Sequence, residues 1–408
     1  MPHVMRKTYL TILCMSALCA SYSYAADKHN DEPITTQYTR RSLYSILVNH
    51  VGEEHSDVIR EQFLDIPVPD QFNDHDLSVK VLDVSKKIKD KVIIDSINWF
   101  IDNNGIASRM VARWFDRDIF TGECSMDLIK DRGLYNATAL DHELAARSQR
   151  GIAMLQDAGE ELIGNTYLIV NDVVYKKSNR GRTWGVIAAL AGTLLGMNSN
   201  EIRSYVEIAR SYKSFSVKIR SYLFRLVWDD ETAKTFYTDF YTASPDAAKV
   251  AAFEANRDKF HLEYVGLVES KGKATSFLGI NEEQPYLMVR KACQRAIDEN
   301  IVDLQTQYEH FRVRTPITEV SPEIKAQIGL KEGVQKGSRF EVLEARLKDD
   351  GRTEYKRIGV VEPIGNKIWD NRYMAVEEQA DNATLGATSF RKVSGGDFYP
   401  GMLLRRID

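Results

Sequence analysis

The chain has 408 residues, of which 43% are hydrophobic and 27% are charged, and its formal net charge is −4. This length and composition exclude a disordered or fibrous chain and predict two or three globular domains with a substantial core. The acidic balance argues against nucleic acid as the main partner. The four cysteines are too few for a disulfide scaffold.

Residues 1–25 have the three parts of a secretory signal. Arg6 and Lys7 provide a positive start, residues 9–20 form an uncharged, mostly apolar core, and Ser23-Tyr24-Ala25 places small residues at a cleavage site. The apolar core is too short for a permanent membrane anchor. We therefore expect an exported protein in the periplasm or associated with the outer membrane, and removal of the signal leaves a net charge of −6.

The cysteines leave two alternatives open. Cys19 offers a lipid-anchored start of the mature chain, although Leu18 stands where a lipoprotein motif has a small residue. Cys124 and Cys293 remain in the mature chain. We favour two buried free thiols over one disulfide, because nothing in the sequence places these two residues together.

Residues 26–80 are polar with short apolar patches, and we expect them to form an N-terminal extension that leads into the fold. The apolar residues that follow recur at helical spacing. One helix is expected around residues 93–101, a second over 106–115 and a third over 151–163.

Residues 166–175 are rich in β-branched and aromatic side chains and predict a central strand. Further strands are expected at 214–228 and 261–268. A long helix with apolar residues at helical spacing, from 284 to 310, closes the domain. With the preceding helices, these elements predict a layered α/β domain over residues 81–318.

A different pattern begins near residue 319. Short alternating segments are separated by glycines, and Asp350-Gly351 between two of them is a strong hairpin signal. Strands are expected at residues 339–345, 355–361, 373–377 and 402–405. The spacing predicts a small closed β-barrel over residues 319–408, so that the expected fold class is α+β.

The most unusual segment is 183–200, where 18 consecutive residues carry no charge. Between residues 176 and 225 there are ten lysines or arginines and two acids, a net charge of +8 in an acidic protein. We interpret 176–213 as an apolar and basic insertion in the α/β domain. A buried core helix is one reading of its apolar part, and insertion into an anionic membrane surface or an acidic partner is the other.

The candidate binding residues lie in this insertion. Gly192 and Gly196 follow the small-xxx-small pattern that lets helices approach closely, and Trp184 begins the same apolar stretch. We expect these residues to contact an envelope protein or the membrane surface. The cations at the edge of the apolar stretch complete the candidate set: Lys176, Lys177, Arg180 and Arg182.

A catalytic function has weaker support in the sequence. The chain lacks a G-x-S-x-G motif, a P-loop and a glycine-rich dinucleotide motif after a strand. An alternative function as an envelope hydrolase rests on Asp157, Glu160 and Glu161, which share one side of the expected helix, or on His142. Scattered histidines indicate no metal site, and no cofactor is expected.

The α/β part resembles a known family. Residues 158–173 (AGEELIGNTYLIVNDV) resemble the step from helix to strand in TolB N-terminal and curli-secretion (CsgG-like) envelope proteins. Upstream, residues 128–134 (LIKDRGL) are similar to the part of that family where a helix is followed by an ER-G-L stretch. Downstream, residues 224–237 lie where the family turns between two strands, and residues 290–307 lie where a helix closes the domain. The resemblance implies a non-catalytic envelope protein. The insertion 176–213 has no counterpart in TolB-like domains, and its glycine and alanine content favours a helix over the membrane strands of the curli channel.

The tail resembles the C-terminal barrel of flagellar T-ring assembly proteins. The matching residues are 330–337 (LKEGVQKG), 340–342 (FEV), 358–361 (IGVV) and 395–404 (GGDFYPGMLL). This second resemblance implies a role in assembling a structure of the cell envelope.

We therefore predict an exported, non-catalytic protein that binds protein or membrane and supports the assembly of a cell-envelope complex. Its expected partners are an envelope protein and the membrane surface, and homo-oligomerisation is left open. Besides the hydrolase, a carbohydrate- or peptide-binding module is an alternative. That module would need Tyr373 and Tyr399 exposed on one face of the barrel.

Overall fold

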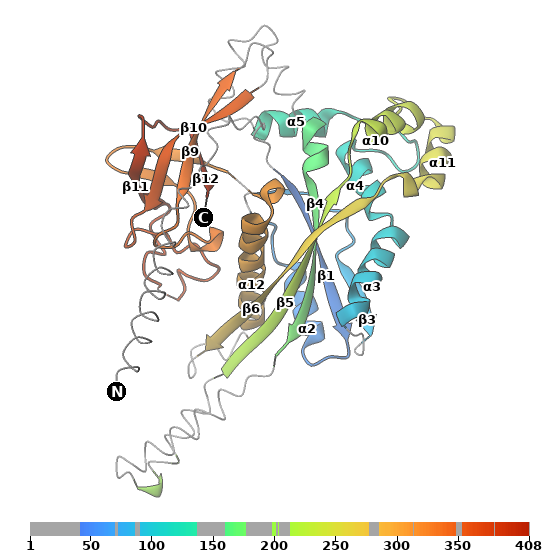
Figure 1. Cartoon of the computed structure of the whole chain (residues 1–408). Helices are drawn as coiled ribbons and strands as arrows, with labels where there is room; N and C mark the ends of the chain where they lie inside the picture. Colours follow the sequence, from blue (N-terminus) through green and yellow to red (C-terminus); the bar gives the residue numbers. More distant parts are fainter. Residues whose placement is uncertain are drawn as a thin grey trace, which may run out of the picture.

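A computed structural model of the chain shows a layered α/β domain and a C-terminal β-barrel (Figure 1). The predicted α+β class is confirmed. The residues that the structure describes are 41–69, 72–85, 90–136, 160–176, 198–200, 203, 213–276, 285–312, 314–347, 353–378 and 380–407.

The α/β domain is built on a mixed sheet with the strand order β2-β1-β4-β5-β6, and β3 also pairs with β1. β1 runs parallel to β2, β3 and β4, whereas β4, β5 and β6 are antiparallel neighbours. The predicted central strand β4 is confirmed. The six strands are β1 (Ser42–Val51), β2 (Asn73–Asp74), β3 (Val81–Ser85), β4 (Thr166–Tyr175), β5 (Lys213–Leu226) and β6 (Leu262–Ser276).

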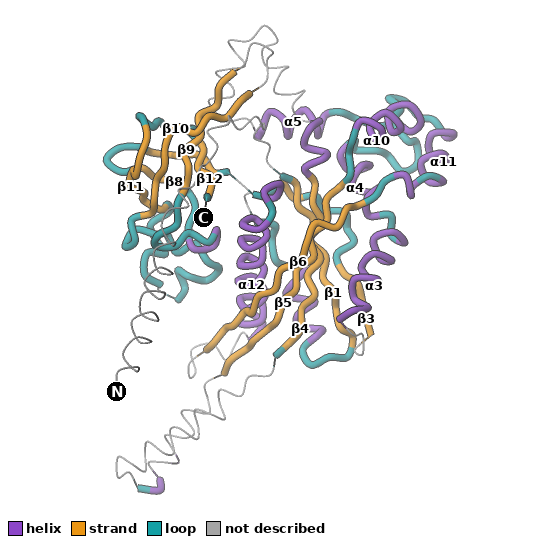
Figure 2. The backbone as a smooth tube through the Cα atoms, in the orientation of Figure 1, coloured by secondary structure: helices purple, strands orange, loops and turns teal. Residues whose placement is uncertain are grey.

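Helices cover both faces of the sheet (Figure 2). On one face lie α3 (Asp90–Asn103) and α4 (Ile106–Trp114), and on the other α2 (Ser56–Leu64) and α12 (Pro285–Gln307). The predicted helices over 93–101, 106–115 and 284–310 are thus confirmed. The shorter helical elements of the domain are α5 (Asp127–Asn136), η1 (Glu160–Asn165), α10 (Asp230–Thr235), η2 (Phe236–Phe240), α11 (Ala247–Ala255), η3 (Arg257–Lys259) and η4 (Glu309–Phe311).

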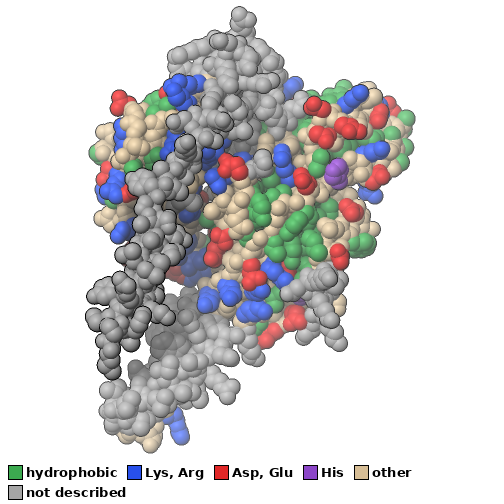
Figure 3. Space-filling model, viewed as in Figure 1, with side chains coloured by type: hydrophobic (Ala, Val, Ile, Leu, Met, Phe, Trp, Pro, Cys, Tyr) green, Lys and Arg blue, Asp and Glu red, His purple; other side chains and the backbone are tan. Residues whose placement is uncertain are grey.

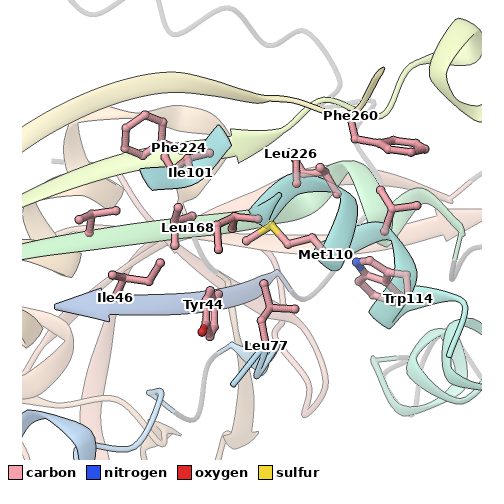
Figure 4. Packing of buried hydrophobic residues seen from close by; sticks show 14 of the residues in the cluster. Tyr44, Ile46, Leu77, Ile101, Met110, Trp114, Leu168, Phe224, Leu226 and Phe260 are labelled. Atoms are coloured by element: carbon pink, nitrogen blue, oxygen red, sulfur yellow. The ribbon is translucent and has the colours of Figure 1, made fainter. Parts of the chain in front are cut away.

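The sheet separates two apolar cores, because successive side chains of a strand point to opposite faces. Ile46 of β1, Leu168 of β4 and Phe224 of β5 contribute to the core under α3 and α4. Figure 4 shows these three residues in one core with Met110 and Trp114 of α4. Their neighbours in the sequence line the second core, under α2 and α12.

The predicted N-terminal extension over residues 26–80 is wrong for its described part, residues 41–69 and 72–80. β1 lies inside the sheet, between β3 and β4, and is buried along nearly its whole length. The strand was not predicted because it contains Ser45, Asn49 and His50, which are polar residue types usually found at the surface. In the fold all three form hydrogen bonds with polar side chains of the neighbouring strands β3 and β4.

The barrel closes in the order β10-β11-β8-β7-β12-β9 around a core of its own. β9 and β10 form the expected antiparallel hairpin, with Leu347 opposite Thr353. The turn at Asp350-Gly351 lies outside the described residues. The barrel elements are β7 (Thr315–Glu319), β8 (Ile324–Ala326), η5 (Leu330–Glu332), β9 (Phe340–Leu347), β10 (Thr353–Pro363), β11 (Thr388–Gly395) and β12 (Leu403–Arg406).

Two expectations for the barrel are corrected. Its first strand begins at Thr315, four residues before the predicted boundary at 319. The strand predicted at 373–377 is wrong, because these residues form turns and Met374 has a φ of +61°. The carbonyl of Tyr373 accepts a hydrogen bond from Arg295 of α12 instead of pairing with a strand (2.8 Å).

Charged side chains join α12 to the barrel. Glu378 forms ion pairs with Lys291 and with Arg295, the latter at 2.8 Å. Burial, together with the charge of Arg295 nearby, lowers the pKa of Lys291 to about 8. Just beyond the other end of α12, Arg405 of β12 contacts Glu309 of η4 at 2.7 Å. The helix that closes the α/β domain is therefore also the support of the barrel.

Candidate functional site

Most of the predicted binding residues lie outside the part of the chain that the structure describes. Lys176 is exposed directly after β4, and its N–H group donates to Ser216 of β5 (2.8 Å). Because β4 and β5 are antiparallel neighbours, the two ends of the insertion, Lys176 and Lys213, lie at the same end of the sheet. The undescribed candidates are Lys177, Arg180, Arg182, Trp184, Gly192 and Gly196.

The described structure contains two of the four residues of the hydrolase alternative. His142 and Asp157 lie outside it, and Glu160 and Glu161 begin η1, a 3₁₀ helix directly before β4.

The two tyrosines of the binding-module alternative are engaged by different parts of the molecule. The guanidinium of Arg290, on α12, lies 5.5 Å from the ring centre of Tyr373. The hydroxyl of Tyr399 lies 3.1 Å from a carboxylate oxygen of Glu344, on β9.

A buried ion group joins the three central strands near the insertion. Asp172 of β4 is fully enclosed, and its carboxylate contacts His50 of β1 at 2.5 Å and Arg220 of β5 at 2.8 Å. A buried carboxylate is stable only when charge and hydrogen bonds compensate its lost hydration. The two basic partners provide that compensation, so this group stabilises the pairing of the strands.

A second polar group crosses the other face of the sheet. Asn171 donates to Ser45 (3.0 Å) and accepts from Ser221 (2.6 Å). Asn300 of α12 donates to the same Ser221 hydroxyl (2.7 Å). This chain of hydrogen bonds fixes the position of α12 over three strands.

His75 forms a third buried polar group at the opposite end of the sheet. Its Nε2 lies 3.1 Å from the carbonyl oxygen of Met110, and its Nδ1 lies 3.3 Å from the guanidinium of Arg132. Arg132 also donates to the Ser42 hydroxyl and to the Asp74 carbonyl, each at 2.9 Å. Burial, aided by the charge of Arg132, lowers the pKa of His75 to about 3. A neutral imidazole therefore helps to hold α5 against β1 and β2.

The described surface feature that stands out is an apolar turn, which we define as residues 118–123. At its tip, Ile119 is 71% exposed and Phe120 is 83% exposed. Two adjacent large apolar side chains with so much exposure are unusual at the surface of a folded domain, and such groups mark interaction sites.

The apolar turn is held in one conformation by its own polar residues. The Asp118 carboxylate accepts from the N–H groups of Phe120 (2.8 Å) and Thr121 (2.7 Å), and these bonds lower the pKa of Asp118. The Asp118 carbonyl accepts from Gly122 (2.9 Å). Gly122 has a φ of +74°, in the left-handed region where glycine is favoured.

The base of the turn is anchored to the α10–α11 region. The carbonyl of Thr121 accepts from the N–H group of Asp246 (2.8 Å). Arg117, just before the turn, is buried and lies 4.4 Å from the ring centre of Phe253 while it donates to the carbonyl of Lys249 (3.2 Å). A rigid base presents the two apolar side chains without the entropy cost of ordering a flexible loop on binding.

The charge around the tip is mostly negative. Asp116, Asp118 and Glu123 are exposed, and Arg113, the nearest exposed cation in the sequence, lies 3.5 Å from Asp116. An apolar tip between carboxylates fits a hydrophobic pocket with a basic rim. It does not fit an anionic lipid surface, which attracts basic segments.

This turn is not among the elements predicted from the sequence. Its signal is an Asp-Ile-Phe-Thr-Gly run, in which Asp118 and Gly122 are turn residues and the apolar pair between them breaks the helical spacing of α4. An apolar pair between two turn residues is a sequence pattern that can indicate exposed side chains at a contact surface.

Within the described residues, no group of three or more His, Cys, Asp or Glu side chains is arranged as a metal site. The same residues contain no helix with the length and apolar character needed to span a membrane. The chain matches no model of a known protein family, and a search of curated proteins found no match.

Proposed function

We propose that this chain is an exported, non-catalytic envelope protein that binds a protein partner and supports the assembly of an envelope complex. The observation that carries the proposal is the apolar turn, where a rigid base displays Ile119 and Phe120. Residues 1–25 support export, and the resemblance to curli-secretion and T-ring proteins supports a place in an envelope assembly.

The polar groups favour the non-catalytic reading. The His50–Asp172 pair has the chemistry of a general base, but Asp172 is fully enclosed and Arg220 balances its charge. The contacts of Asp172 with His50 and Arg220 stabilise the pairing of β1, β4 and β5. The partner we propose carries an apolar pocket with basic residues at its rim, which complements the tip and its carboxylates. The insertion 176–213 is proposed as a second contact, with a protein or with the membrane surface.

The test uses a photo-crosslinking amino acid at position 120 of the full chain in its native host. We expect discrete adducts of higher mass at position 120 and none at position 99. Trp99 of α3 is a matched control, because its side chain is also apolar and is 63% exposed.

The double variant I119S/F120S should lose the partner that the adduct identifies, while its thermal unfolding stays close to that of the natural chain. Burial of two such side chains contributes roughly 1.5–3 kcal/mol each, so affinity should fall about 100-fold or more. W99S should bind normally. Equal binding by I119S/F120S and the natural chain would refute the proposal. Loss of binding to anionic vesicles instead of a protein would favour the membrane reading.

A further inference from the structure

β6 forms one edge of the sheet, and it has 15 residues. In Figure 1 it crosses in front of the other strands, with α12 on one side and α3 and α4 on the other. Figure 3, drawn from the same side, shows hydrophobic, acidic and basic side chains close together on this face. A long edge strand is a template for pairing with another strand, because half of its backbone groups point away from the sheet.

The register shows which residues of β6 direct their backbone groups outward. The Ser216 carbonyl accepts from Lys176, so even-numbered residues of β5 bond to β4 and odd-numbered residues bond to β6. Ile219 and Val217 lie opposite Ser270 and Gly272, which therefore bond to β5. The intervening residues, Leu267, Glu269, Lys271 and Lys273, direct their N–H and C=O groups to the edge with which no described strand pairs.

The side chains of the same outward residues are accessible. Leu267 is 39% exposed, the Glu269 side chain is 41% exposed, and Lys271 and Lys273 are exposed. Ser270, between them, points to the other face and donates to the carbonyl of Ala296 on α12 (2.8 Å). Backbone groups and charged side chains are thus available together along this edge.

The charged side chains on this edge determine which added strand can pair favourably with β6. Lys271 lies opposite Lys218 of β5 in the register, and Lys218 makes its ion pair with Glu269 instead (2.6 Å). Lysines on a free edge deter unspecific strand addition. An added strand is favoured when it brings a carboxylate to Lys271 and a cation to Glu269.

A second copy of the same strand meets this requirement in one antiparallel register. With the two-fold axis at Ser270, Glu269 of each copy lies opposite Lys271 of the other, and Leu267 lies opposite Lys273. A register centred on Glu269 or on Lys271 would place like charges opposite each other, which is destabilising. We propose that the chain forms a two-fold dimer by antiparallel pairing of β6, centred on Ser270. This interface is separate from the apolar turn and does not depend on the proposed function.

Sedimentation velocity of the purified full chain over a range of concentrations tests the proposal. We expect a reversible monomer–dimer equilibrium. E269K and K271E should each weaken the dimer about ten-fold, because each turns two attractive cross-strand pairs into repulsive ones. The double variant E269K/K271E exchanges the charges and should restore the dimer. A chain that stays monomeric at all concentrations, or single variants that dimerise normally, would overturn the proposal.

Cysteine crosslinking tests the register. Directly opposite residues of an antiparallel pair have Cα atoms about 4.5–5.5 Å apart, which is within the range of a disulfide. The double variant L267C/K273C should therefore give a covalent dimer under mild oxidation, because both positions are exposed and lie opposite each other in this register. L267C alone should not, because its counterpart is Lys273. Cys124 and Cys293 are buried and free, so the natural chain without residues 1–25 should stay uncrosslinked. Crosslinking of L267C alone, or no crosslinking of L267C/K273C, would refute this register.

Discussion

The buried His75 should make the stability of the α/β domain depend on pH between 7 and 5. A carbonyl oxygen only accepts hydrogen bonds, so the ring nitrogen that faces Met110 must carry the proton, and the other nitrogen accepts from Arg132. The ring is fully buried, and its pKa falls to about 3. The folded state therefore holds His75 neutral throughout this range.

The sign and size of the effect follow from the two states. In the unfolded chain His75 has a pKa of about 6.5 and gains a proton as the pH falls below that value. In the folded chain His75 stays neutral over this range. Its contribution to the free energy of unfolding is therefore fully present above pH 6.5 and declines as the pH falls toward 3. Between pH 7 and pH 5 the loss from this one residue is about 2 kcal/mol.

The measurement is urea unfolding at pH 7 and pH 5, followed by tryptophan fluorescence. Trp114 is a suitable probe, because its ring lies 5.4 Å from that of His75. In H75Q the amide can donate to Met110 and accept from Arg132 but cannot titrate in this range. Between pH 7 and pH 5, the free energy of unfolding of the natural chain should fall by about 2 kcal/mol more than that of H75Q. H261Q, at an exposed histidine, is the control and should behave as the natural chain does. An equal pH dependence for H75Q and the natural chain would refute the reasoning.

Two further predictions concern packing. A Cβ atom on Gly272 would lie 1.9 Å from the carbonyl oxygen of Ala292, so G272A should destabilise the domain by roughly 1–3 kcal/mol in urea unfolding. At Gly396 the nearest atom is 3.6 Å away, so G396A should be nearly neutral, and a similar loss in both variants would contradict this account. Burial raises the pKa of Cys293 to about 12 and also raises that of Cys124. Iodoacetamide should therefore modify both thiols only after unfolding, and rapid modification of the folded chain would contradict their burial.

The elements that the sequence predicted are those whose periodicity is continuous. In α4, Met110, Val111 and Trp114 recur at helical spacing and are fully buried. β4 is apolar on both faces from Tyr167 to Val170, and its composition alone predicts a strand. These segments can be predicted because the hydrophobic effect, the dominant favourable term in folding, places an apolar residue at each buried position of the pattern.

The elements that could not be predicted from the sequence depend on partners distant in the chain. β1 carries serine, asparagine and histidine because polar side chains 34 to 126 residues away bond to them. Such pairing leaves no local signal. The barrel strand β8 has only three residues, too few for a period of two to be seen. Of the candidate binding residues only Lys176 lies in the described part of the chain, so the role of the insertion stays a prediction.

The proposed β6 dimer should strengthen partner binding by the apolar turn. A dimer paired through β6 carries two apolar turns, because each copy contributes one. When a multimeric partner offers two pockets within reach, the second contact becomes intramolecular, and avidity can exceed single-site affinity by roughly 10²–10⁴-fold. E269K, which weakens the dimer without touching the turn, should then reduce retention of the partner at low chain concentration, and E269K/K271E should restore it. If E269K left retention unchanged, each turn would act alone, and the dimer would have no part in binding.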